Sequence, residues 1–308
     1  MTRIFGRMAT GEGPRWTERI GQGWFAVDAA PEPASLFDWI DAGGKCGAAL
    51  EREPGLLPAL LPHQLLCQFA NYRSHLKETG RDPAAPTRNV VFAKAISSVT
   101  AAGGVVVKPP EVRLLDYEIE IGLVIGRPVS SPLDRAGARA ALRGLVLGND
   151  LSARDIQLGD VQAFRAKSFR GFTPLGPWLV VPDPDGWERW DELRLQLWVN
   201  DDLRQDSYAS DIVHRPLDTL MMLSGTIDLA VGDVILTGTP GGTALRAPGK
   251  AAMTIGKLLP HSVAMRAFAK RQAANPAYLK VGDHIRARVA TDDGAIDLGE
   301  QSLRIAAP

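Results

Sequence analysis

The amino-acid sequence predicts an α+β fold that is rich in β-strands. Short apolar runs alternate with turns through much of the chain, which contains 31 glycines and 22 prolines. With 308 residues, the chain is long enough to fold around a large core without disulfides or metals.

The composition changes along the chain and predicts two domains. Residues 1–62 hold short apolar pieces at Trp24–Val27 and Leu36–Ile40 and end in a proline-containing stretch, which predicts a small N-terminal domain. Residues 63–308 contain the regular alternation of strands and turns, and we expect them to form the main domain.

Several segments of the main domain are predicted strands, because each is a short apolar or alternating run bounded by turn residues. They are Glu118–Ile125, Gly144–Gly148, Trp178–Val181, Leu193–Val199, Asp233–Thr237, His284–Ala290 and Ser302–Ile305. Asn200 and Asp201 favour a tight turn directly after one of these strands.

Two segments of the main domain are predicted helices. Residues 216–224 begin with a proline, which suits a first turn, and Gly225 supplies a stop. Residues 262–274 are rich in good helix formers, with Ser262 as a possible N-cap. This second helix lies within 244–277, a stretch that has basic residues and no acidic ones.

The overall charge gives no preference for a polyanionic partner. The chain has 35 basic and 35 acidic residues, so we expect neither nucleic acid nor a membrane as a partner. No apolar run is long enough to cross a bilayer, and no signal peptide is evident, which favours the cytoplasm. Cys46 and Cys67 are too far apart for a zinc knuckle or a redox pair.

Acidic and apolar residues alternate between Asp116 and Ile121. On a strand, Glu118 and Glu120 project from one face and the isoleucines from the other. That face needs water or a cation, because two adjacent carboxylates repel each other. These residues alone favour the solvated face of an edge strand over a metal site.

Asp150 follows a short apolar run and is a candidate third acidic ligand. Three carboxylates would form an all-oxygen site, which favours Mg²⁺, with Mn²⁺ or Ca²⁺ as alternatives, over zinc. Alternatively, Asp150 caps the following turn.

Four sequence blocks resemble the fumarylacetoacetate hydrolase superfamily, in the order in which that family has them. They are DYEIEIGLVIG at 116–126, GNDLSARDIQ at 148–157, KSFRGFTPLGPWLV at 167–180 and LTGTPGG at 236–242. The resemblance implies a mixed β-roll or sandwich core with helices at its periphery, and 63–308 as the catalytic domain. It also implies a metal held by Glu118, Glu120 and Asp150.

The same resemblance implies roles for further residues. Arg154 and Gln157 are expected to contact the substrate, Lys167 to stabilise developing negative charge, and Thr239 to hold the substrate's carboxylate. An upstream block at 69–78 is similar to the family's lid helix.

On that helix, His75 and Glu78 are three residues apart and share a face. We therefore expect His75 to act as a general base assisted by the Glu78 carboxylate. Taken without the neighbouring blocks, His75 would be an ordinary surface residue.

The stretch 244–277 departs from the family pattern, because the strand opening LKVGD at 279–283 is expected soon after the glycine-rich turn. We interpret 244–277 as a basic helical insertion. It is either a surface or subunit-contact helix, or it overhangs the site and attracts dianionic substrates through Lys270 and Arg271.

The resemblance implies a metal-dependent hydrolase that cleaves a carbon–carbon bond in a small anionic 2-oxo acid, such as an acylpyruvate. The first alternative is a hydratase, isomerase or decarboxylase acting on 2-oxo or 2-hydroxydienoic acids in aromatic catabolism. A non-catalytic metal-binding module is a more remote alternative. The resemblance also implies a homodimer. The sequence has no GxSxG, phosphate-binding GxxxxGK or HExxH motif.

Overall fold

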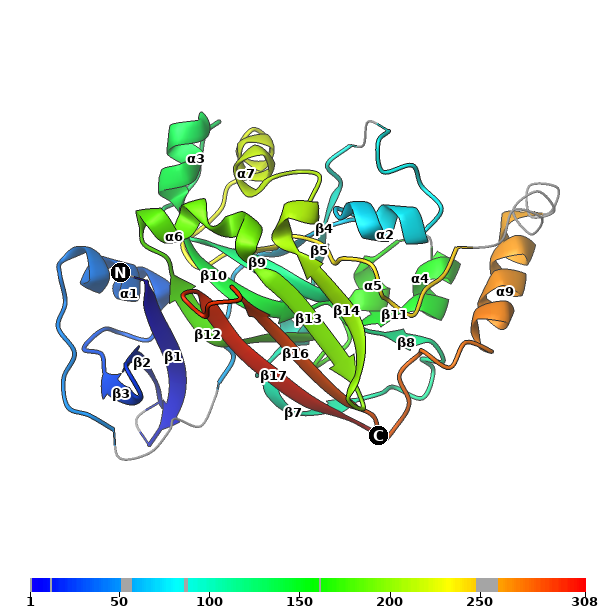
Figure 1. Cartoon of the computed structure of the whole chain (residues 1–308), viewed down its shortest axis with the longest axis horizontal. Coiled ribbons are helices and arrows are strands. Elements are labelled where there is room, and N and C mark those ends of the chain that lie inside the picture. The colour runs from blue at the N-terminus through cyan, green and yellow to red at the C-terminus, as the bar shows by residue number, and fades with distance from the viewer. Residues whose placement is uncertain (1, 12, 51–56, 86–87, 161, 248–259) are drawn as a thin grey trace.

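A computed structural model describes residues 2–11, 13–50, 57–85, 88–160, 162–247 and 260–308 (Figure 1). Strands form two large sheets, and helices lie around them. The predicted β-rich α+β fold is therefore confirmed. The middle of the predicted insertion, 248–259, and residues 51–56 lie outside the described residues.

The larger sheet has ten described strands and carries the carboxylates discussed below. Its path is β3 (Gly23–Ala26), β2 (Gly13–Ile20), β1 (Arg3–Thr10), β12 (Thr173–Val181), β10 (Leu142–Asn149), β9 (Ile119–Ile125), β15 (Val234–Leu236), β4 (Leu65–Gln68) and β5 (Val91–Lys94), and β6 (Val99–Thr100) also pairs with β12. The central strands β9, β10 and β12 are buried along most of their length, so their near-continuous apolar sequences fit a strand covered on both faces.

A second sheet packs against the first. Its order is β14 (Asp202–Tyr208), β13 (Arg194–Val199), β16 (His284–Ala290), β17 (Asp297–Ala306) and β7 (Gly103–Val107). Strand β17 contacts β10 and β12, and the Gln301 side chain amide of β17 donates to the Leu147 carbonyl oxygen at 3.2 Å. The two sheets thus form the sandwich that the resemblance implied (Figure 1). A short pair, β8 (Leu115–Asp116) with β11 (Ser152–Ala153), lies beside them.

The described helices are short and surround the sheets. They are α1 (Pro33–Asp41), α2 (Arg73–Glu78), α3 (Arg135–Ala141), α4 (Arg154–Asp160), α5 (Phe164–Lys167), α6 (Pro184–Glu188), α7 (Pro216–Ser224) and α9 (His261–Gln272), with 3-10 turns at Ile96–Ser98, Trp190–Glu192 and Ala209–Asp211. No helix in the described part of the chain has both the length and the apolarity that a bilayer crossing requires.

The first strands of the chain extend the larger sheet. Strand β1 pairs with β12 in antiparallel register, and β2 and β3 follow outward. In Figure 1 these strands lie at one end of the molecule and α9 lies at the other.

The predicted elements are present with shifted ends. Helix α7 has the predicted bounds, whereas β12 begins at Thr173 instead of Trp178. Asn200 and Asp201 have φ angles of 51° and 68°, the left-handed conformation of a tight hairpin turn. Helix α9 begins at His261, so the prediction of Ser262 as its N-cap is wrong.

Candidate active site

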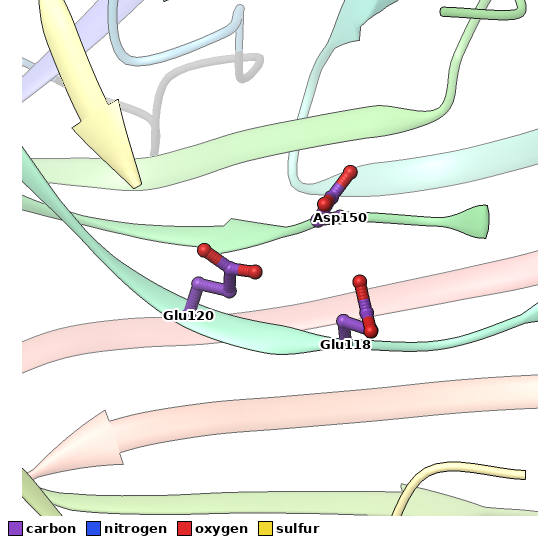
Figure 2. A group of neighbouring side chains, drawn as sticks. All are labelled: Glu118, Glu120 and Asp150. Carbon is purple, nitrogen blue, oxygen red and sulfur yellow. The ribbon is translucent and has the colours of Figure 1, made fainter. Parts of the chain in front are cut away.

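Glu118, Glu120 and Asp150 come together where β9 begins and β10 ends. Glu118 immediately precedes β9, Glu120 lies within it, and Asp150 follows the last residue of β10. One oxygen from each carboxylate lies within 4.8 Å of the others. Figure 2 shows the three carboxyl groups directed into a common space, and all three residues are buried.

Both simpler interpretations of these residues are wrong. Strand β9 is not an edge strand, because it lies between β10 and β15. Asp150 does not cap a turn through its side chain, because its two carboxylate oxygens accept hydrogen bonds from Lys94 and Lys167.

Backbone contacts explain why the acidic residues converge. The Asp150 amide donates to the Glu118 carbonyl oxygen at 2.8 Å, and the Asn149 side chain accepts from the Glu118 amide at 3.1 Å. Gly238, at φ 81°, points its amide at Glu120 Oε2 at a distance of 2.8 Å. A side chain at 238 would be strained at this φ, which explains the glycine.

Three buried cations surround the carboxylates. The Lys167 ammonium group bridges Glu118 and Asp150, and the Lys94 ammonium group pairs with the other oxygen of Asp150. Arg154 pairs with Glu118 and, through Nε at 2.8 Å, with Asp116. Each of these cations is therefore fixed by at least one buried carboxylate.

Glu120 is the exception in this network. No lysine or arginine side chain pairs with it in the described part of the chain, where its hydrogen-bond donor is the Gly238 amide. Burial, reinforced by Asp150 and Glu118, raises the pKa of Glu120 well above its usual range. Burial also raises the pKa of Glu118, but the positive charges of Arg154 and Lys167 outweigh burial and lower that pKa below its usual range. One carboxylate of the cluster therefore lacks a cation.

The residues fit a divalent metal. The four carboxylates of Asp116, Glu118, Glu120 and Asp150 face three cations, which leaves one uncompensated negative charge. A divalent cation between the three clustered carboxylates would compensate Glu120 and leave one net positive charge. Carboxylate oxygens are the ligands that Mg²⁺ and Mn²⁺ prefer.

A cavity of about 490 Å³ opens above the cluster, within the usual range for small-molecule sites. Its floor includes Glu118 and Glu120, and its walls include His75, Arg154 and Gln157. The cavity also contacts two further predicted site residues, Lys167 and Thr239.

His75 is buried on α2 and faces this cavity. Burial lowers the pKa of His75 to about 4, against an ordinary value of 6.5, so the imidazole is neutral at pH 7. Its Nδ1 atom has no hydrogen-bond partner among the residues that the structure describes. A neutral imidazole can accept a proton, as a general base must.

In the described part of the chain, no hydrogen bond or ion pair joins Glu78 to His75. Its carboxylate accepts from the Gly242 amide at 2.8 Å and lies 3.6 Å from the Arg246 guanidinium group. The Ala247 amide donates to the Glu78 carbonyl oxygen at 3.2 Å. Glu78 thus ties the end of α2 to the chain after the glycine-rich turn, and the predicted pairing with His75 is not made in this structure.

Two predicted substrate-binding residues are engaged within the protein. Gln157 Oε1 accepts from Arg154 at 2.9 Å. The Thr239 hydroxyl donates to the Ile119 carbonyl oxygen at 2.8 Å and accepts from the Gln205 side chain at 2.8 Å. Their contacts with substrate stay predictions.

Comparison with known proteins identifies the family. Residues 64–305 match the model for the C-terminal domain of fumarylacetoacetate (FAA) hydrolase. The chain belongs to the fumarylacetoacetate hydrolase family. This confirms the resemblance carried by the four sequence blocks.

Individual family members extend the comparison. The chain is 35% identical to an oxaloacetate tautomerase of Bacillus subtilis over 58% of this chain and 58% of that protein. It is 32% identical to a mitochondrial oxaloacetate tautomerase of Bos taurus over 61% of this chain and 59% of that protein. The chain thus spans about three fifths of the length of these two relatives. The fumarylacetoacetate hydrolase structure of Exiguobacterium antarcticum superposes with a TM-score of 0.76 at 24% identity, covering 99% of this chain and 100% of that chain, and shows the same fold.

Sequence reasoning missed Lys94, Asp116 and Gly238 as site residues. Lys94 ends an apolar strand, where a lysine needs a buried partner, and this was an available signal. Asp116 lies in the first family block and accepts from Arg154 and from the Ala244 amide at 2.7 Å. It therefore links the floor of the cavity to the start of the predicted insertion.

The lowered pKa of His75 predicts a specific acid sensitivity. The unfolded chain takes up a proton near pH 6.5 and the folded protein only near pH 4, so the stability contributed by neutral His75 is present above pH 6.5 and is lost as the pH falls towards 4. Relative to His75→Gln, the wild type should lose up to about 3 kcal/mol more of its free energy of unfolding over this range.

Chemical denaturation of both proteins at several pH values between 7 and 4 measures this difference. The groups that set the His75 pKa besides burial are Glu118, which raises it, and Arg154, Lys167 and Arg81, which lower it. Parallel pH profiles for the two proteins would contradict the prediction.

Proposed function

We propose that the protein is a metal-dependent enzyme that moves a proton at the carbon next to the carbonyl group of a small 2-oxo acid. Its overall reaction would be a keto–enol tautomerisation or an isomerisation. The observation that carries the proposal is a neutral, buried His75 in the same cavity as a carboxylate cluster that lacks one cation.

Glu118, Glu120 and Asp150 would hold Mg²⁺ or Mn²⁺, which when bound supplies Lewis-acid polarisation of the substrate's carbonyl group. Removing the adjacent proton then places negative charge on the substrate's oxygen. His75 would accept that proton and return it to the other position.

Lys167 and Arg154 would supply fixed positive charge. Burial disfavours the charged form of Lys167, but Asp150 and Glu118 outweigh burial and raise its pKa, so the ammonium group stays protonated. Arg154 is held in place by Asp116, Glu118 and Gln157 and keeps Glu118 ionised. With a divalent cation, the cluster would have a net positive charge and favour an anionic substrate.

The relatives support a reaction of this class. Those from Bacillus subtilis and Bos taurus are named oxaloacetate tautomerases. A tautomerase needs a base and a group that stabilises the enolate, and it needs no activated water.

Hydrolysis of an acylpyruvate, which the sequence motifs alone favoured, is the second candidate. The size of the cavity favours it, because about 490 Å³ leaves room for an acyl group and a water molecule. In that reaction water adds to the distal carbonyl, the carbon–carbon bond breaks, and a carboxylic acid and pyruvate leave. The water must be deprotonated, and the resemblance assigns that task to His75 with Glu78.

Product analysis separates the two candidates. The protein with Mg²⁺ is incubated in deuterium oxide with oxaloacetate and with several acylpyruvates, and the products are followed by proton NMR and by enol absorbance. We expect rapid enol–keto interconversion with deuterium at the carbon beside the carbonyl group. Two carbon fragments appearing as fast as deuterium would establish the hydrolase, and no reaction of either kind would refute both.

The variant Glu78→Gln also distinguishes the two candidate reactions. A glutamine can still accept from the Gly242 amide and loses only the partly exposed interaction with Arg246. We expect enol–keto interconversion within about fivefold of the wild type, the range of one exposed ion pair. If Glu78 assists His75, turnover should instead fall about a hundredfold or more. Stopped-flow enol absorbance measures the rate.

A further inference from the structure

The wall of the active-site cavity changes character from its floor to its mouth. The floor is charged and buried, with Glu118, Glu120 and Lys167 each less than 5% exposed. At the mouth the cavity is lined by exposed residues, among them Phe69 and Arg81. A ligand anchored at the floor would therefore extend towards Arg81.

The wall between these two ends is largely apolar. Phe92, Leu158 and Leu245 contribute to it, and Val90 lies beside Phe69 because their backbones are hydrogen-bonded at 2.8 Å. Apolar walls favour a carbon chain over a hydrated group. They leave recognition by charged groups to the two ends of the cavity.

Arg81 lies shortly after helix α2 and is well placed to recognise an anion. Its guanidinium group lies over the Phe69 ring, 5.1 Å from the ring centroid. No carboxylate pairs with Arg81 anywhere in the described ranges of the chain. A guanidinium group that stacks on a ring keeps the donors along its edge available for a carboxylate.

The basic helix α9 does not provide this charge. Lys270 and Arg271 are exposed and do not line the active-site cavity, whereas Leu245, at the start of the predicted insertion, does. The expectation that these two residues attract a dianionic substrate therefore has no support in the described part of the cavity wall. Among the described residues that line the cavity, Arg81 is the exposed cation.

We propose that Arg81 determines specificity for the substrate's tail by binding a second carboxylate at its far end, with the carbon chain against the apolar wall. The substrate would then be a dianionic 2-oxo acid. This inference rests on the proposed function, because it assumes that the 2-oxo acid end is bound at the carboxylate cluster.

Binding of unreactive analogues tests the proposal without turnover. Oxamate carries the same carbonyl and carboxylate groups as a 2-oxo acid. N-alkyl oxamates are compared with N-(carboxyalkyl) oxamates of equal chain length, from two to five carbons, by calorimetry on the Mg²⁺-loaded full chain. At the chain length that reaches Arg81, the carboxylate member should bind about tenfold more tightly.

Three variants test whether Arg81 causes the preference for the carboxylate member. Arg81→Gln should abolish the preference for the carboxylate member and leave the binding of the alkyl member unchanged, and Arg81→Lys should retain part of the preference. Arg135→Gln is the matched control, because Arg135 is exposed, pairs with Asp218 on the surface and does not line the cavity. It should retain the full preference.

Equal binding of both members at every length by the wild type would overturn the proposal. The proposal would also be overturned if Arg81→Gln bound the alkyl and the carboxyalkyl oxamates equally more weakly than the wild type. That result would mean that Arg81 acts through the nearby His75. If oxamate binds but its tail makes no difference, the role of Arg81 fails and the proposed function stands. If neither oxamate nor any derivative binds, both fail.

Discussion

Replacement of Glu120 by glutamine should abolish turnover and yet make the metal-free protein harder to unfold. Glu120 is a buried carboxylate with no cation paired to it in the described residues, and it lies beside Asp150 and Glu118. A glutamine can still accept a hydrogen bond from the Gly238 amide. It also removes the repulsion between the Glu120 carboxylate and those of Asp150 and Glu118. We expect the free energy of unfolding without metal to rise by about 1–3 kcal/mol.

The same substitution removes one of three metal ligands. Loss of an outer partner of a metal ligand typically costs about 10–100-fold in affinity or activity, so loss of a ligand should cost at least about a hundredfold in both. The melting temperature measured with and without Mg²⁺ or Mn²⁺ reports both effects. The wild type should be stabilised by the metal, and Glu120→Gln should not be.

Glu300→Gln is the matched control for this experiment. Glu300 lies on β17, is exposed and pairs with Arg286 at 3.3 Å, so the same chemical change is made outside the cavity. It should retain turnover and the metal-induced rise in melting temperature. A Glu120→Gln protein that is still stabilised by metal, or that is less stable without it, would refute the assignment of Glu120 as a ligand.

The core of the candidate site was predictable because it depends on local periodicity. Glu118 and Glu120 are two residues apart on one strand and must share a face, whatever the rest of the fold does. Asp150 follows the neighbouring strand, and antiparallel pairing of β9 with β10 brings it to the same end. The family blocks supplied the association between these two segments.

The cations and Glu78 were harder to predict, since their partners depend on long-range contacts. Lys94 reaches Asp150 from β5, the last strand on the far side of β9, and that strand order cannot be derived from periodicity. Helical spacing correctly placed His75 and Glu78 on one turn. The glycine-rich turn then approaches α2 closely enough for the Gly242 amide to bind the Glu78 carboxylate.

The predicted helices and strands were wrong or incomplete where the sequence signals were weak. A serine near the start of a helical segment is a common N-cap, but α9 begins one residue before Ser262, after Pro260. Strand β1 was not predicted, although its pairing with β12 extends the main sheet. Its sequence alternates weakly, and the pairing with residues about 175 positions away supplies the stabilisation that the segment lacks locally.

Replacement of His75 by glutamine should remove proton transfer and leave the metal site intact. His75 contributes no oxygen to the carboxylate cluster, and its neutral imidazole is the base in the proposed reaction. Loss of a general base typically costs about 10²–10⁴-fold in rate. We therefore expect enol–keto interconversion to fall by that factor, while the melting temperature still rises when Mg²⁺ or Mn²⁺ is added.

These two measurements distinguish His75 from the metal ligands. Glu120→Gln should lose both turnover and stabilisation by the metal, whereas His75→Gln should lose only turnover. His284→Gln is the matched control, since His284 lies on β16, bonds Ser302 at 2.8 Å and does not line the cavity. If His75→Gln turned over at the normal rate, another group would have to take the proton. If it lost metal binding as well, the substitution would have disturbed the cluster, and the rate would say nothing about a base.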